Sequence, residues 1–190
     1  MTSTAANALA DRVAFVEVGT TNVAELEKIN LALFPIKYPP QVYQDIVTCS
    51  GVSFLATIDD DRGPGAAART IGGVACRLEK DAKVDGPILY IITLGVLAPW
   101  RNAGLGSALL ERVLRTVREA LPEVVLARLH VQINNSEARD FYAKLGFSCL
   151  GVSKLYYKRL EPPDAWVLAR PFTDEGREAL DRIRATLDPA

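Results

Sequence analysis

Two glycines separated by one residue, Gly104 and Gly106, lie between an apolar run and an amphipathic pattern in the stretch PWRNAGLGSALLERVL (residues 99–114). A glycine-rich turn that leads into a helix presents free backbone N–H groups and the positive end of the helix dipole to an anion. Arg101 can add a charge-assisted bond to a phosphate oxygen. The spacing predicts a phosphate-binding turn, while a plain strand-to-helix turn packed through glycine remains the alternative.

This turn matches neither of the two common nucleotide-binding motifs. A P-loop is excluded because no Gly-Lys-Ser/Thr follows the glycines and Ser107 is not preceded by lysine. The three-glycine spacing of a dinucleotide fingerprint is also missing. The phosphate, if one binds, therefore belongs to another kind of cofactor.

One histidine and one tyrosine are candidates for acid–base chemistry. His130 is the single histidine of the chain, and its reference pKa of about 6.5 suits proton acceptance near neutral pH. Tyr90 lies in the apolar run ILYIITLGVL (residues 88–97). From residue type alone, a structural histidine and a core tyrosine are the simpler interpretation.

The hydrophobic periods that must position these residues predict a mixed α/β fold. Strands are expected at 13–18, 53–60, 71–80, 88–97, 124–133, 147–160 and 165–170. Helices are expected at 22–34, 42–49, from Gly104 onward, from an Asn135 or Ser136 cap to Gly146, and in a charged tail from Thr173. The connector DDRGPGAAART (residues 60–70) is predicted to be a hairpin loop, and Gly95 indicates a bulge in its strand. A central strand–helix–strand unit thus runs from residue 88 to residue 133.

Composition limits the class of protein. With 190 residues, of which 49% are apolar, we expect one domain at 13–170, a loose tail at 1–12 and a helical extension at 171–190. The net charge of -1 argues against nucleic-acid or anionic-membrane partners, and no apolar run reaches the ~20 residues of a membrane span. Three cysteines without CxxC spacing predict reduced thiols, a cytoplasmic or nuclear location and no metal site.

Four separated motifs carry a family resemblance: FPIKY (34–38), LYIITLGVLAPWRNAGLG (89–106), LHVQINNSEARDFYAKLGF (129–147) and YYKRLEPPDA (156–165). They resemble the GCN5-related N-acetyltransferase (GNAT) superfamily, whose R/QxxGxG/A motif binds the pyrophosphate of acetyl-CoA. More narrowly, they resemble the catalytic subunits of NatE-type N-terminal acetyltransferases. The insertion DRGPGAAART, extra residues near 81–87 and the tail after Arg170 depart from the family pattern but interrupt no motif.

The resemblance implies acetyl-CoA as the cofactor and a role for each matching residue. Tyr90 and His130 would relay the amine proton through an ordered water, and Tyr142 would donate toward the departing thiolate. Acetyl-CoA would be held by Leu94, Val96, Arg101, Asn102, Ala103, Gly104, Leu105, Gly106, Ser107 and Asn135. The first methionine side chain of the peptide would be held by Phe34, Pro35, Ile36, Tyr157 and Leu160, and its backbone by Tyr38 and Tyr156. Ile92 would be a further substrate-binding residue.

The sequence therefore predicts a single-domain GNAT-like enzyme that acetylates the α-amine of polypeptides beginning with methionine. Attack on acetyl-CoA would be direct, in a ternary complex, because no cysteine has a histidine nearby in sequence to activate it. A ribosome-anchoring, NatA-like complex is a candidate partner. Alternatives are a lysine side-chain acetyltransferase, a small-amine acetyltransferase with carboxylates near its acceptor site, and a non-catalytic acetyl-CoA-binding subunit, against which intact Tyr90 and His130 argue.

Overall fold

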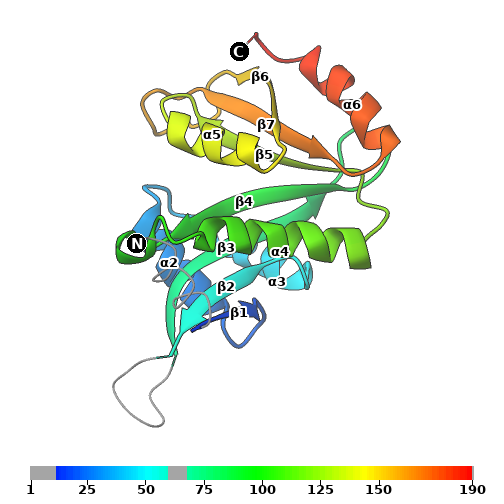
Figure 1. Ribbon diagram of the computed structural model, residues 1–190. Coiled ribbons are helices and arrows are strands. Elements are labelled where there is room, and N and C mark those ends of the chain that lie inside the picture. Colours follow the sequence, from blue (N-terminus) through cyan, green and yellow to red (C-terminus); the bar gives the residue numbers. More distant parts are fainter. Residues whose placement is uncertain (1–11, 60–67, 190) are drawn as a thin grey trace, which may run out of the picture. The chain divides into compact units, whose positions relative to one another are not determined.

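Seven strands are hydrogen-bonded in the order β1-β2-β3-β4-β5-β7-β6 (Figure 1). The computed structural model describes residues 12–59 and 68–189. The strands are β1 (Val13–Glu17), β2 (Phe54–Ile58), β3 (Arg69–Glu79), β4 (Ile88–Val96), β5 (Leu126–Gln132), β6 (Ser148–Ser153) and β7 (Ala165–Pro171). The helices are α2 (Val23–Leu33), α3 (Pro40–Thr48), α4 (Leu105–Ala120), α5 (Ser136–Lys144) and α6 (Asp174–Arg184), with a 3-10 turn, η1, at Ala98–Trp100.

The central strand–helix–strand unit predicted from the sequence is confirmed. β4 leads through α4 into β5, and the two strands pair in parallel from Ile88 opposite Leu126 to Tyr90 opposite Arg128. The pairs β1–β2, β2–β3, β5–β7 and β6–β7 are antiparallel. The mixed α/β sheet is therefore the predicted fold class.

The chain divides into two compact units, which are described separately. The first unit comprises Met1–Arg77 and Ile92–Ala120, and the second comprises Leu78–Ile91 and Leu121–Ala190. The glycine turn and α4 belong to the first unit, and Tyr90 and His130 to the second. β4 contributes its beginning to the second unit and its end to the first.

In the first unit, helices cover both faces of the strands. Phe54 and Leu55 are neighbours in β2, so their side chains point to opposite faces. Leu55 belongs to a buried cluster with side chains of α2 and α3, whereas the guanidinium of Arg112, on α4, lies 5.1 Å from the ring centre of Phe54. The pair α2 and α3 therefore covers one face and α4 the other. α4 buries one stripe at helical spacing, formed by Leu105, Leu109, Leu110, Val113, Leu114 and Val117.

The second unit repeats this arrangement with α5 and α6. Trp166 and Ala169, three residues apart on β7, face opposite sides of the sheet. The guanidinium of Arg139, on α5, lies 4.6 Å from the ring centre of Trp166. Ala169 lies instead in a buried cluster that includes Ile183 of α6. The charged C-terminal tail thus forms a helix whose apolar side packs into the core of this unit.

The structure corrects one strand. The sequence predicts a strand over residues 147–160, but β6 ends at Ser153 and residues 154–164 form turns. Leu155 has a φ of +52° and is 69% exposed, and its N–H donates to the Asp164 carboxylate at 2.9 Å. This local bond turns the chain where the pattern continued it.

Several predictions fall on residues outside the described ranges. The tail at 1–12 lies outside them except for its last residue, and the hairpin connector lies outside them at 60–67. Within residues 12–59 and 68–189, no helix is long and apolar enough to span a membrane. In the same ranges, no group of three or more His, Cys, Asp or Glu side chains could hold a metal ion.

Candidate active site

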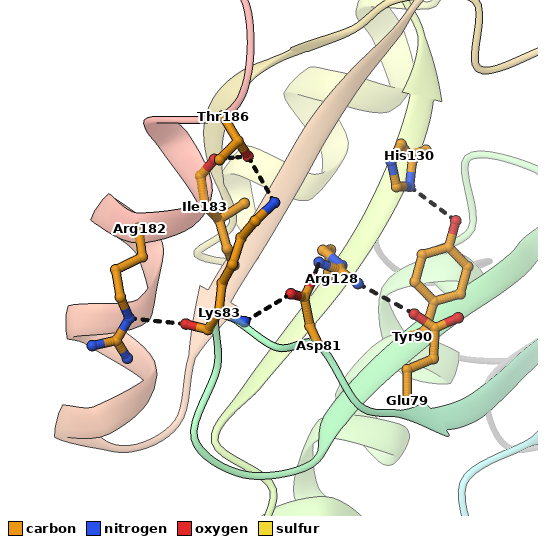
Figure 2. A network of polar contacts seen from close by, with 9 residues as sticks. All are labelled: Glu79, Asp81, Lys83, Tyr90, Arg128, His130, Arg182, Ile183 and Thr186. Carbon is orange, nitrogen blue, oxygen red and sulfur yellow. Dashed lines mark hydrogen bonds and ion pairs between the residues drawn. The ribbon is translucent and has the colours of Figure 1, made fainter.

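The fold of the second unit brings the two predicted acid–base residues together. The Tyr90 hydroxyl lies 2.9 Å from Nδ1 of His130, across a sequence separation of 40 residues. Tyr90 is opposite Arg128 in the β4–β5 pairing, and His130 follows Arg128 by two residues on the same strand. Side chains two apart on a strand share a face. Tyr90, Arg128 and His130 therefore line one face of adjacent strands (Figure 2).

Two tyrosines from the turns after β6 complete this cluster. The Tyr156 hydroxyl lies 2.5 Å from the Tyr90 hydroxyl, and its ring stacks on the His130 ring with centres 3.9 Å apart. The Tyr157 hydroxyl donates to the His130 backbone carbonyl at 3.3 Å. Tyr156, predicted only as a peptide-backbone ligand, is thus a direct neighbour of the acid–base pair.

Burial favours the neutral forms of both Tyr90 and His130. It raises the pKa of Tyr90 far above its usual value, and the neighbouring Tyr156 hydroxyl raises it further. Burial also lowers the pKa of His130 to about 4, with a smaller contribution from the positive charge of Arg128. At neutral pH the pair is a phenol and a neutral imidazole, joined by one hydrogen bond. A neutral imidazole has one ring nitrogen free to accept a proton.

The glycine turn in the first unit has the geometry of an anion site. Gly104 has a φ of +79°, and a Cβ added there would meet nothing within 4 Å. α4 starts at the next residue, and the N–H of Ala108 donates to the Gly104 carbonyl at 3.0 Å. The N–H groups before Ala108 have no acceptor within the helix. Arg101 is exposed and donates from Nε to the Val96 carbonyl at 2.9 Å, which holds its guanidinium beside the turn. This open turn fits a pyrophosphate.

The other predicted cofactor residues divide between the two units. Leu94 and Val96 are half-buried on β4 in the first unit. Asn135 lies in the second unit, where its side chain accepts from the Ala138 N–H at 3.0 Å and caps α5, as one of the two predicted caps. Tyr142 is buried on α5 with its ring edge against Phe147. Their roles toward acetyl-CoA stay predictions.

The residues of the predicted methionine pocket belong to both units. In the first unit, a Cβ on Gly95 would lie 2.6 Å from Leu33 and 3.3 Å from the Phe34 ring, so glycine makes room for the end of α2. Ile92, three residues before Gly95, also packs against the α2–α3 cluster. Residues three apart on a regular strand face opposite sides, so this placement agrees with the bulge predicted at Gly95.

The remaining peptide-binding candidates differ in their exposure to solvent. Tyr38 packs against the α2–α3 cluster, Ile36 is half-buried and Pro35 is exposed. In the second unit, Tyr157 and Leu160 are half-buried in the turns after β6, and the Leu160 N–H donates to the Tyr157 carbonyl at 3.4 Å. Whether these residues enclose one methionine side chain stays a prediction.

Sequence reasoning missed Arg128, the charged neighbour of the acid–base pair. Its guanidinium contacts Asp81 at 2.6 Å and Glu79 at 3.3 Å. The available signal was its position, since β5 alternates and places Arg128, His130 and Gln132 on one polar face. Its carboxylate partners, 47 and 49 residues away in sequence, gave no comparable signal.

Known proteins are similar to this chain in sequence and in fold. The sequence pattern of the family described as "Acetyltransferase (GNAT) family" matches residues 22–147. N-alpha-acetyltransferase 50 of Danio rerio is 36% identical over 159 residues, which cover 84% of this chain and 88% of that protein. Probable N-acetyltransferase san of Drosophila melanogaster is 35% identical over 154 residues, covering 81% of this chain and 78% of its own.

A solved structure of similar sequence carries a ligand. It is the structure of Arabidopsis thaliana Naa50 in complex with the bisubstrate analogue CoA-Ac-MVNAL, with a TM-score of 0.73 and 35% identity. The match covers 85% of this chain and 99% of that one.

Proposed function

Because the chain belongs to the acetyltransferase (GNAT) family, we propose that it acetylates the α-amine of polypeptides that begin with methionine. Acetyl-CoA is the acetyl donor of this family, and the open turn at Gly104 with the start of α4 and Arg101 would hold its pyrophosphate. The observation that carries the proposal is the hydrogen bond between Tyr90 and His130, which joins a proton donor to a neutral acceptor.

The chain's own residues would remove the proton of the attacking amine. Tyr90 accepts this proton at its oxygen, through a bridging water, while its own proton passes to Nδ1 of His130. The Tyr156 hydroxyl, 2.5 Å from that of Tyr90, stabilises the phenol oxygen as charge develops on it. Acetyl-CoA, when bound, supplies the acetyl group as a thioester. The amine loses one proton and the imidazole gains one. The C–N bond would form as the thioester C–S bond breaks, and the leaving thiolate would take a proton from the Tyr142 hydroxyl, so the transfer balances.

The thiols support direct attack without an acyl-enzyme. Cys76 is fully buried, and burial raises the pKa of its thiol well above the usual range. Cys49 and Cys149 are half-buried and form no disulfide. A protonated thiol is a poor nucleophile. The amine itself therefore acts as the nucleophile in a ternary complex.

Two features support methionine as the first residue. The analogue bound to the Arabidopsis relative carries the peptide MVNAL, which begins with methionine. This chain has apolar side chains at the matching motif positions, among them Phe34, Ile36 and Leu160. Full burial of a methionine side chain contributes roughly 1.5 to 3 kcal/mol, which corresponds to about ten- to a hundredfold in discrimination.

The partners and the location are also proposals. Cys49, Cys76 and Cys149 form no disulfide, which supports a reducing compartment, cytoplasmic or nuclear. The resemblance to NatE-type enzymes supports association with a ribosome-anchoring, NatA-like complex. Co-purification of the full chain with ribosomes, compared in low and high salt, tests that association.

A peptide panel tests the function. Peptides that begin with Met, Ser or Ala, and a peptide with a blocked α-amine and an internal lysine, are compared by kcat/KM with acetyl-CoA. Met-first peptides are expected to react at least tenfold faster than the others. Phe34→Ala should raise KM for Met-first peptides and leave kcat nearly unchanged, because the lost contact is shared by ground and transition states. A preference for the blocked lysine peptide would identify a lysine acetyltransferase instead.

A further inference from the structure

Arg128 lies on the same strand face as the acid–base pair, although no step of the proposed reaction uses it. It is the cross-strand partner of Tyr90 and precedes His130 by two residues on the same face of β5. Its side chain is only 14% exposed. The ion-paired guanidinium therefore shares a strand face with the imidazole that would accept the proton.

Two carboxylates fix the Arg128 guanidinium. Nη1 donates to Asp81 at 2.6 Å and Nη2 donates to Glu79 at 3.3 Å, and both acidic side chains are 20% exposed. The Nε atom is buried and has no hydrogen-bond partner in the part of the chain that the structure describes. Buried ion pairs add little net stability, because desolvation offsets their attraction. Stability alone therefore does not explain this cluster.

The carboxylate of Asp81 is itself anchored by the C-terminal helix. The N–H of Lys83 donates to Asp81 at 3.1 Å, and Nε of Arg182, on α6, donates to the Lys83 carbonyl at 2.8 Å. Nζ of Lys83 donates to the Thr186 hydroxyl at 3.2 Å. Figure 2 shows this continuous series of contacts from α6 through the loop after β3 to Arg128. The C-terminal segment therefore fixes the loop that carries Asp81, and Asp81 in turn holds the guanidinium of Arg128.

We propose that Arg128 is a positioning residue for the acid–base pair: clamped by Asp81 and Glu79, its guanidinium keeps His130 in the neutral form that accepts the proton from Tyr90. This inference rests on the proposed acetyl transfer for the direction of that proton. The other groups that face His130 within this unit are the hydroxyls of Tyr90, Tyr156 and Tyr157, which carry no charge at neutral pH.

The positive charge of Arg128 disfavours protonation of His130. A second positive charge on the imidazole would repel the guanidinium in a site with little water to screen the two. Burial and Arg128 both lower the pKa of His130. Asp81 and Glu79 hold the guanidinium through ion pairs, and their negative charges offset only part of its repulsion of an imidazolium. Arg128 thus extends the range in which the acceptor is neutral toward acid pH.

The single histidine allows a direct test. NMR titration of the imidazole in untagged protein reports only His130, because the chain has no other histidine. Arg128→Gln is expected to raise the His130 pKa by about one unit or more toward 6.5, whereas Arg128→Lys, which keeps the charge, should stay within about half a unit of the parent. Arg182→Gln is the matched control, since it removes the same charge from the outer part of the network.

Two results would overturn the proposal: an unchanged His130 pKa in Arg128→Gln, or an equal rise in Arg182→Gln. If Arg128→Gln does not fold, the triple variant Glu79→Gln, Asp81→Asn, Arg128→Met replaces it. That variant leaves no unpaired carboxylate and is expected to raise the pKa as well. Acetylation of Met-first peptides is measured separately. Loss of the pKa effect in a protein that acetylates these peptides refutes the role of Arg128 alone, and a pKa effect in a protein that does not acetylate them refutes the proposed function alone.

Discussion

Protonation of His130 should destabilise the folded protein as the pH falls from about 6.5 to about 4. In the folded chain the pKa of His130 is about 4, because burial and Arg128 disfavour the imidazolium. In the unfolded chain the pKa returns to about 6.5. Between these values the unfolded state binds a proton that the folded state does not bind, so the free energy of unfolding decreases across this window. Above pH 6.5, both states hold a neutral imidazole and this contribution is constant.

The size of the effect follows from the two pKa values. Each pH unit within the window lowers the free energy of unfolding by about 1.4 kcal/mol. The loss is therefore about 2.5 kcal/mol at pH 4.5 and approaches about 3 kcal/mol at pH 4. Natural domains have unfolding free energies of about 5 to 15 kcal/mol, so this loss is large enough to measure.

Urea unfolding at pH 7.5, 6.0, 5.0 and 4.5 measures this loss, with His130→Gln as the control. Carboxylates such as Asp81, whose pKa is lowered chiefly by its hydrogen bond from Arg128, titrate in both proteins and cancel in the comparison. The difference in unfolding free energy between parent and variant should shift toward the variant by about 2.5 kcal/mol between pH 7.5 and 4.5. A difference that is the same at both pH values would show that His130 is not held neutral by its surroundings.

Three further predictions concern the site and the packing. Gly104→Val should weaken acetyl-CoA binding at least tenfold in calorimetry, because it adds a side chain where phosphate approaches the backbone; an unchanged Kd would exclude this turn as the cofactor site. Tyr90→Phe and His130→Gln should each lower kcat by on the order of 100-fold, and together by less than the product, since they act in one relay; a full product would mean separate roles. Gly176→Ala should lower Tm by several degrees, because its Cβ would lie 2.0 Å from a backbone carbonyl oxygen, whereas Gly19→Ala, with open space, should not; equal Tm values would contradict the packing.

The elements with clear periodicity were predictable from the sequence. The apolar run of β4, which has the length of a strand, and the helical stripe of α4 predicted the central strand–helix–strand unit. The α5 cap at Asn135 was one of two predicted possibilities, since asparagine and serine both cap helices well. These features depend on residues that are close in sequence, so one amino-acid sequence is enough to predict them.

The turns after β6 were not predictable in the same way. Residues 154–160 contain leucines and tyrosines that suit a strand, but the Asp164 carboxylate binds the Leu155 N–H and the Lys154 ammonium, at 2.9 and 3.0 Å, and reverses the chain. The contact of Tyr156 with Tyr90 depends on this reversal, and so does its stacking on His130. A pattern of residue types cannot indicate which side chain will compete with a sheet for a backbone N–H.

The opposite pKa shifts of Tyr90 and His130 limit the protonation states that the proposed proton relay can use. A raised pKa of Tyr90 and a lowered pKa of His130 both favour the phenol–imidazole pair over a tyrosinate–imidazolium pair. The resting site is therefore neutral, and only the acidic amine formed during attack can drive a proton into it. In the proposed relay, that proton would leave His130 readily once transfer is complete, because Arg128 disfavours the imidazolium. The same charge that keeps the acceptor available before attack thus restores it for the next turnover.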